Sequence, residues 1–211
     1  DFGDLTAARY GSGGTGNSTR GVFGGGNTGS RVNTIDYITI ATIGDASDFG
    51  DLNNAIEGAG ACSSTTRAVF GGGKTPTIIN VMDYITIGST GNATDFGDLE
   101  ATTNGAAGAS SSTRGLFMGG FTPTVLDTVQ YITISSTGNT TDFGNLTDAR
   151  KLVAGVSSSI RAVCGGGADP SVSDILDYVT IASTGDAADF GDLSAVKQKF
   201  AACSNGHGGL S

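Results

Sequence analysis

The chain has 211 residues, of which 36 are glycine and 15% are charged, and its formal net charge is −9. We expect no nucleic-acid partner, because the lysine and arginine clusters that hold phosphates are missing from the sequence. We expect no membrane insertion, because no run of 18 or more apolar residues occurs. This much glycine also excludes a mainly helical fold, since glycine inside a helix costs about 1 kcal/mol relative to alanine.

One tripeptide, Asp-Phe-Gly, recurs every 47 residues. It begins at Asp1, Asp48, Asp95, Asp142 and Asp189, and no insertion or deletion breaks the interval. A period of 20–50 residues is typical of solenoids, propellers and arrays. We therefore interpret residues 1–211 as a single repeat array with a partial last copy. Because the sequence starts without methionine, we expect it to be processed or cut from a longer chain.

Four short strands are predicted in each copy. In the second copy, residues 48–52 form a strand with Phe and Leu as core anchors, and the small residues 58–63 suit the crowded inner strand of a blade. Residues 67–73 form a strand that ends in a glycine turn, and residues 81–87 are rich in β-branched and aromatic side chains. Four strands per 40–50 residues is the pattern of a propeller blade. The anchoring phenylalanines are Phe2, Phe49, Phe96, Phe143 and Phe190.

The order of residues within a copy resembles the kelch repeat. An arginine, a hydrophobic pair, a glycine doublet, a tyrosine-bearing strand and an aromatic residue before leucine follow one another, with phenylalanine in place of the usual tryptophan. The resemblance covers essentially the whole chain and implies an all-β, kelch-like β-propeller of four-stranded units. A β-solenoid or a stacked-strand fibre is the alternative.

The near-identical runs GVFGGG, DYITI, STGNAT and DFGDL also resemble repeat proteins of tailed phages, notably those that infect cyanobacteria. That resemblance implies a structural protein of a virion, tail fibre or extracellular filament, located in the virion or outside the cell. Its partners would be further copies or other virion proteins, and its loops would bind a cell-surface glycan. The alternative is a soluble carbohydrate- or protein-binding module.

No catalytic set is predicted. The one histidine, His207, lies in a glycine-rich tail, and the groups needed for nucleophilic or metal-assisted catalysis are missing from the sequence, so we expect no enzyme. Cys62 and Cys203 share a repeat position, and Cys164 stands where other copies have phenylalanine. We expect all three to be buried free thiols that act as small hydrophobes, without disulfide or metal.

The repeated carboxylates have two interpretations. Paired carboxylates such as Asp48 and Asp51 could ligate calcium, since calcium prefers several oxygen ligands, and Asp45 lies three residues ahead and could add one ligand, as Asn92 and Asp186 could in other copies. We favour the other interpretation, in which these side chains cap turns and pair with the repeated arginines, and so predict no cofactor. Those arginines are Arg20, Arg67, Arg114 and Arg161.

The copies differ most at positions 6–10 and in the loop after the glycine triplet. Loops on a rigid scaffold commonly carry binding, although such residues can also vary without a function. The exposed ligand-binding candidates are Arg9, Tyr10, Lys74, Phe121 and Lys151. Glycosylation sequons begin at Asn17, Asn92, Asn139 and Asn145, and they matter only in a eukaryotic secretory route.

The last copy lacks the arginine and the glycine triplet, as an end repeat would. Five whole copies of 47 residues would need about 24 residues more than the 211 present. Such residues upstream of Asp1 would close a five-bladed ring with a shared blade, and further upstream repeats would give a larger ring. Without them, neighbouring chains would have to cover the open strand edges.

Overall fold

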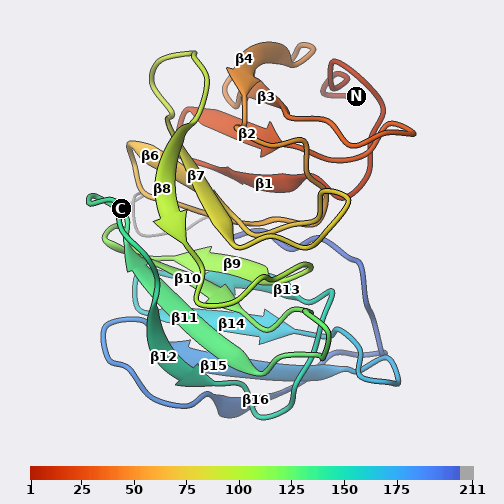
Figure 1. The fold of residues 1–211 in the computed structure, drawn as a ribbon, viewed down its shortest axis with the longest axis vertical. Coiled ribbons are helices and arrows are strands. Elements are labelled where there is room, and N and C mark those ends of the chain that lie inside the picture. Colours follow the sequence, from red (N-terminus) through yellow and green to blue (C-terminus); the bar gives the residue numbers. More distant parts are fainter. Residues whose placement is uncertain (205–211) are drawn as a thin grey trace.

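Sixteen short strands form four antiparallel sheets in this computed structural model, which describes residues 1–204 (Figure 1). Each sheet takes four strands that are consecutive in the chain. The first contains β1 (Gly13–Gly16), β2 (Arg20–Gly24), β3 (Thr34–Thr39) and β4 (Ser47–Asp51), and the second β5 (Gly60–Ser63), β6 (Arg67–Gly71), β7 (Val81–Thr86) and β8 (Thr94–Asp98). The third contains β9 (Ala107–Ser110), β10 (Arg114–Met118), β11 (Thr128–Thr133) and β12 (Thr141–Asn145), and the fourth β13 (Ala154–Ser157), β14 (Arg161–Gly165), β15 (Ile175–Thr180) and β16 (Ala188–Asp192). None of the described residues forms a helix long and apolar enough to cross a membrane.

The predicted strands are confirmed in order, and glycines with positive φ set their limits. The inner strand of the second sheet begins at Gly60 rather than residue 58, because Gly58 has a φ of 73°, far from the extended region. β6 ends at Gly71 because Gly72 and Gly73 turn the chain with φ values of 71° and 101°. Each third strand carries a register shift against the fourth, as between Met82 and Asp83 in β7.

Buried apolar side chains gather between successive sheets. One cluster joins the first sheet to the second, another the second to the third, and a further one the third to the fourth. The middle cluster includes Val69, Met82 and Phe96 from one sheet and Phe117 and Ile132 from the next. The second and third sheets thus pack both faces against neighbours, and the first and fourth sheets pack one face each, as successive blades do. The protein is a four-bladed β-propeller, and we number the blades 1 to 4 in chain order.

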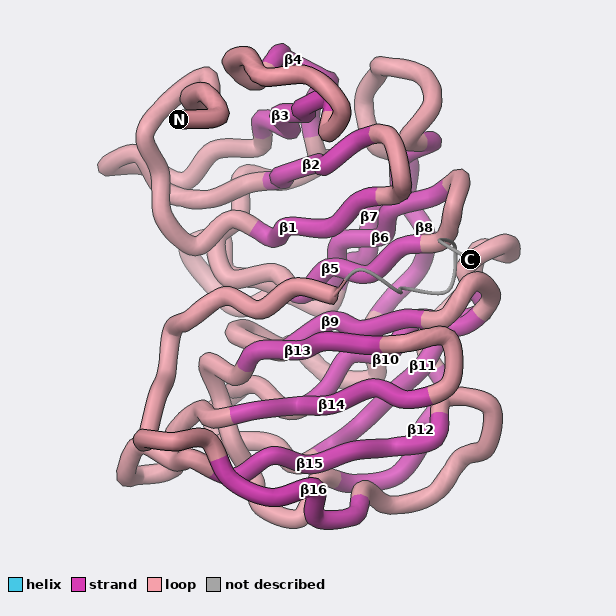
Figure 2. The backbone as a smooth tube through the Cα atoms, turned by 180° about the vertical axis from the view of Figure 1, so that it is seen from behind, coloured by secondary structure: helices cyan, strands magenta, loops and turns pink. Residues whose placement is uncertain are grey.

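The inner strands β1, β5, β9 and β13 lie beside one another along the axis of the propeller (Figure 2). After β16 the chain returns to this axis and runs across the front of the inner strands in Figure 2. There the Lys199 amide donates to the carbonyl of Leu152 at 3.2 Å, as Leu152 does to Gly105 and Gly105 to Gly58. The segment 199–204 therefore occupies a fifth inner position. It forms no strand, although one was predicted there.

Three predictions of burial are wrong at the two ends of the array. Phe49, Phe96 and Phe143 are each 2% exposed, but Phe2 is 39% and Phe190 52% exposed. Cys203 is exposed as well, whereas its counterpart Cys62 is buried. A side chain at one of these positions is buried only where the next blade packs against it. The described chain has no complete blade between blade 4 and blade 1, so these three side chains remain exposed.

Candidate functional site

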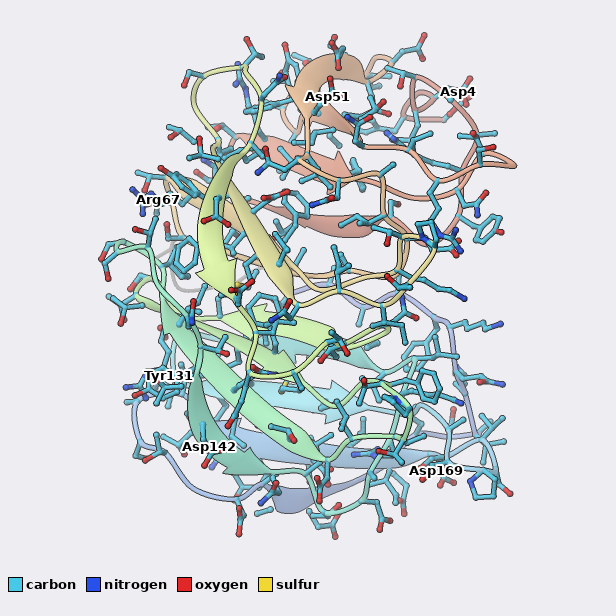
Figure 3. The ribbon with its side chains drawn as sticks, viewed as in Figure 1. Asp4, Asp51, Arg67, Tyr131, Asp142 and Asp169 are labelled. Carbon is cyan, nitrogen blue, oxygen red and sulfur yellow. The ribbon has the colours of Figure 1, made fainter. Side chains whose placement is uncertain are left out.

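The repeated arginines connect neighbouring blades. The guanidinium carbon of Arg67 lies 4.5 Å from the centre of the Tyr84 ring, and its Nη1 donates to the carbonyl of Ile134 in the next blade at 3.2 Å. Tyr84 meets the Phe96 ring edge to face at 5.9 Å. The predicted pairing with aspartate is therefore wrong, since a ring face and a carbonyl take up the arginine. Figure 3 shows Arg67 and Tyr131 toward one end of the blades and Asp169 at the other.

The predicted turn capping by the repeated aspartates is confirmed for Asp48, and side chains three residues ahead of the Asp-Phe-Gly segments cap as well. Asn92 Oδ1 accepts from the Asp51 amide at 3.0 Å, and Asp45 Oδ1 accepts from the Asp4 amide at 3.0 Å. Asp48 Oδ1 accepts from Gly50, which lies two residues along the chain. Within residues 1–204, no three His, Cys, Asp or Glu side chains come close enough together to hold a metal ion. The calcium alternative therefore finds no preassembled carboxylate set in this part of the chain.

A cavity of about 850 Å³ lies among the inner strands of all four blades and the segment 200–204. The described residues that line it are uncharged, and most are Gly, Ala, Ser or Thr. A serine ladder crosses its wall. Ser63 Oγ donates to the Gly16 carbonyl at 2.6 Å, and Ser110 Oγ donates to the Ser63 carbonyl at 2.7 Å. The amide of Ser110 in turn donates to Ser157 Oγ at 3.1 Å, so side chains 47 residues apart tie the blades together.

Small residues are required in this wall because the inner strands approach closely. A Cβ atom on Gly108 would overlap the carbonyl oxygen of Ala61, and one on Gly155 would lie 2.5 Å from the carbonyl oxygen of Gly108. These distances leave no room for a side chain at Gly108 or Gly155. The predicted crowding of the inner strand is therefore confirmed, and its cause is contact between neighbouring backbones.

Two thiols stay inert inside the blades. Burial raises the pKa of Cys62 and that of Cys164 to about 12, so both are protonated at neutral pH. Cys62 lines the cavity wall, and Cys164 belongs to the core between blades 3 and 4. Both confirm the prediction of buried free thiols, and Cys203 contradicts it because its side chain is exposed.

The variable residues meet at one end of the blades, which we call the loop face. It comprises repeat positions 10 and 27 with the loops after the glycine turns. Antiparallel bridges join the two positions within each copy: Tyr10 with Asn27, Glu57 with Lys74, Asn104 with Phe121, and Lys151 with Ala168. The loop face therefore collects four of the five predicted binding residues. Tyr10 is 67% exposed, and Lys74, Phe121 and Lys151 are half-buried.

Contacts between residues of different repeat copies hold the side chains of the loop face in place. Lys151 Nζ lies 4.6 Å from the centre of the Phe121 ring, which brings two predicted binding residues together. Glu57 accepts from Arg31 at 2.8 Å and from Asn27 Nδ2 at 2.8 Å, and the Asn27 bond and Arg31 lower the pKa of Glu57. Reasoning from the sequence missed Arg31 and Glu57, because their partners lie 26 and 30 residues away in the chain.

Arg9 does not belong to the loop face. Its side chain is 1% exposed, pairs with the buried carboxylate of Asp36, and donates to the Thr34 carbonyl at 3.1 Å. The prediction that Arg9 is exposed is wrong, because the chain turns its side chain inward onto β3. Arg150 stands at the same repeat position and pairs with Asp177 in the same way. Arg9 and Arg150 are therefore parts of the blade interior.

Blades 2 and 3 have other residues at the two positions of this ion pair. Ile56 and Asp83 stand at its two positions in blade 2, and Thr103 and Gln130 in blade 3. Asp83 accepts from the Asn53 amide at 2.9 Å and from Asn53 Nδ2 at 2.6 Å. Burial raises the pKa of Asp83, and the two Asn53 bonds only partly oppose that effect. No cationic side chain within residues 1–204 pairs with this carboxylate inside blade 2.

The fold and this geometry define the chain as a β-propeller with a small-residue core and one variable face. No protein-family model matches the chain, and a search of curated proteins finds no match either. The class therefore rests on the blades themselves.

Proposed function

We propose that the protein is a non-enzymatic structural building block of a phage virion, tail fibre or extracellular filament, and that its loop face binds a host-surface glycan. The observation that carries this proposal is the contrast between the two ends of the blades. The Arg–Tyr–Phe stack recurs in all four blades, with ring distances of 5.8–6.0 Å. The loop face has a different pair of residues in every copy.

The chemistry of the loop face suits a sugar. Tyr10 and Phe121 offer aromatic rings, Lys74 and Lys151 offer charged donors, and each of the four takes part in a β-bridge between the two variable positions of its copy. Sequence likeness to tailed-phage repeat proteins supplies the biological setting and the expected location in a virion or outside the cell. Self-association or other virion proteins would be the structural partners.

A glycan array tests the binding half of the proposal. The paired variants are Tyr10→Ala, which removes an exposed ring, and Ile43→Ala, which removes an 80% exposed side chain from a loop at the other end of the blades. Tyr10→Ala should lower glycan binding at least tenfold, while Ile43→Ala leaves it unchanged. Equal effects of the two changes, or no glycan bound by the parent, would contradict a loop-face site.

A soluble carbohydrate- or protein-binding module is the second candidate, and it shares the loop face with the first. Electron microscopy and solution mass of the natural protein separate them. Fixed oligomers or filaments favour the structural building block, and a monomer that binds its ligand favours the module. Catalytic turnover that is lost on changing one named residue would contradict both.

A further inference from the structure

Among the described residues, two blade faces without a packed neighbour border one sector of the propeller, between blade 4 and blade 1, which we call the open sector. On blade 1, Ile40 is 47% exposed, although its counterparts Ile87, Ile134 and Ile181 are at most 1% exposed. On blade 4, Phe190 is 52% exposed, against 2% for Phe49, Phe96 and Phe143 in the other three blades. These are the same two surfaces that meet in the three interblade cores, so the open sector continues an interface already built three times.

Segments at both ends of the chain already occupy the inner and outer positions of this sector. Ser204 Oγ accepts from the Ser157 amide at 3.4 Å, which extends the serine ladder into the segment 199–204. On the outer side, the amide of Gly44 donates to the Phe2 carbonyl at 2.8 Å and that of Ala46 to the Asp4 carbonyl at 2.8 Å. Blade 1 bonds to blade 2 in the same way, through Phe49 and Asp51. Residues 1–4 thus lie where the outer strand of another blade would lie.

Residues 1–204 supply no middle strands for such a blade in this sector. Cys203 lines the central cavity but is exposed, although its counterpart Cys62 is 1% exposed in the core between blades 2 and 3. Phe2 has no tyrosine against its ring among the described residues, whereas each of the four blades supplies one. Arg161 stacks on Tyr178 but donates to no carbonyl of a following blade within residues 1–204, unlike Arg67 and Arg114.

We propose that this open sector binds a two-stranded antiparallel β-hairpin with the sequence chemistry of the chain's own middle strands. The geometry specifies its residues. The first strand needs an arginine to donate to the Ile40 carbonyl, as Arg20 does to Ile87. The second needs a tyrosine against Phe2 and, after it, an apolar residue whose carbonyl accepts from Arg161. Backbone bonds to the inner and outer segments complete a four-stranded sheet.

The hairpin at residues 112–135 of this chain has this composition and shows how each face would be used. Leu116 and Val129 pack toward the following blade, and Phe117, Ile132 and Ile134 pack toward the preceding one. In the open sector the first pair would cover Ile40 and its neighbours on blade 1. The second set would cover Phe190 on blade 4. The site is independent of the loop face, and its test is independent of glycan binding.

A synthetic peptide of residues 112–135 tests the proposal on the full 211-residue chain. Binding is followed by anisotropy of the labelled peptide and by the rate at which a thiol reagent modifies Cys203. We expect saturable binding and at least a tenfold slower modification of Cys203, while a scrambled peptide of the same composition does neither. Absence of binding, or equal binding of the scrambled peptide, overturns the proposal.

Two surface variants locate the bound hairpin. Ile40→Asp places a charge on the open face of blade 1 and should weaken peptide binding at least tenfold. Ile43→Asp places the same charge at an 80% exposed position whose counterparts, Thr90, Thr137 and Thr184, are exposed in every other blade, and it should leave binding unchanged. Both side chains are already exposed, so both variants should fold. Equal effects of the two variants overturn the proposal. A dimer by solution mass that protects Cys203 and resists the peptide also overturns it, because a second copy would then fill the sector.

Discussion

Replacing Asp177 with asparagine should destabilise the protein far more than the same replacement at Asp83. The two aspartates share a repeat position and are 0% and 4% exposed. Asp177 pairs with Arg150, whose side chain is 2% exposed and whose Nη1 also donates to the carbonyls of Gly166 and Ile175. Asp177→Asn leaves that guanidinium buried without a counter-charge, which costs about 3–5 kcal/mol of unfolding free energy.

Asp83→Asn has the opposite balance. No arginine faces Asp83, and the change removes a carboxylate whose ionisation burial opposes. One bond to Asn53 is lost, at about 1 kcal/mol, and the removed desolvation offsets it, so the net change should stay within about 1 kcal/mol. The raised pKa of Asp83 also sets the direction in which stability changes with pH. Because burial raises the pKa of Asp83 in the folded state, the parent loses stability as pH rises from the ordinary aspartate pKa of 3.8 to that raised pKa. Asp83→Asn should remove that loss.

Thermal and urea unfolding, followed by circular dichroism at several pH values, measure both variants. A loss of 3–5 kcal/mol lowers Tm by roughly 6–20 °C in a domain of this size. The double variant Arg150→Thr/Asp177→Gln copies the residues of blade 3 and should regain part of the loss. Equal costs for Asp177→Asn and Asp83→Asn would refute the reasoning, because the arginine is the difference between the two sites.

Three further predictions concern packing, blade contacts and thiol access. Gly108→Ala should lower the free energy of unfolding in urea by at least about 2 kcal/mol, because the new Cβ meets the Ala61 backbone of the neighbouring blade. Gly88→Ala is the control and should be neutral, because the space around Gly88 is open. Equal effects of the two variants would contradict the close approach of the inner strands. Arg67→Ala should lower the free energy of unfolding by about 1–2 kcal/mol, and Arg161→Ala should lower it less, since of these two arginines Arg67 is the one that bonds to a following blade. The reverse order of the two unfolding free energies would contradict the interblade role. A thiol reagent should modify Cys203 within minutes and the two buried thiols only on unfolding, as peptide mass mapping would show, and rapid labelling of all three would contradict the burial.

The repeats made the strands and their order predictable, because each copy carries the same turn glycines and the same β-branched run. The partner of each side chain was harder to predict. Arg67 bonds to Ile134, which is 67 residues away, and only the stacking of blades brings the two together. The exposure of Phe2 and Phe190 has the same origin, since their sequence context matches that of their buried counterparts.

The burial of Arg9 had a signal in the sequence that went unused. Arginine at position 9 and aspartate at position 36 occur together in copies one and four, and both positions change in copy three. Such joint change between copies indicates contact. It could have predicted the Arg9–Asp36 and Arg150–Asp177 pairs and moved Arg9 from the list of exposed binding residues to the interior.

The residue pairs at repeat positions 9 and 36, which differ between blades, also affect folding. A chain of near-identical copies risks pairing a strand of one copy with the neighbour from another, because the main-chain register is the same in every blade. Asp177 in the place of Gln130 would have Thr103 beside it instead of Arg150, and would be buried without its cation. The different interior residues thus disfavour a strand of blade 1 or 4 taking the place of its counterpart in blade 2 or 3, and the near-identical copies are distinguished by their buried pairs.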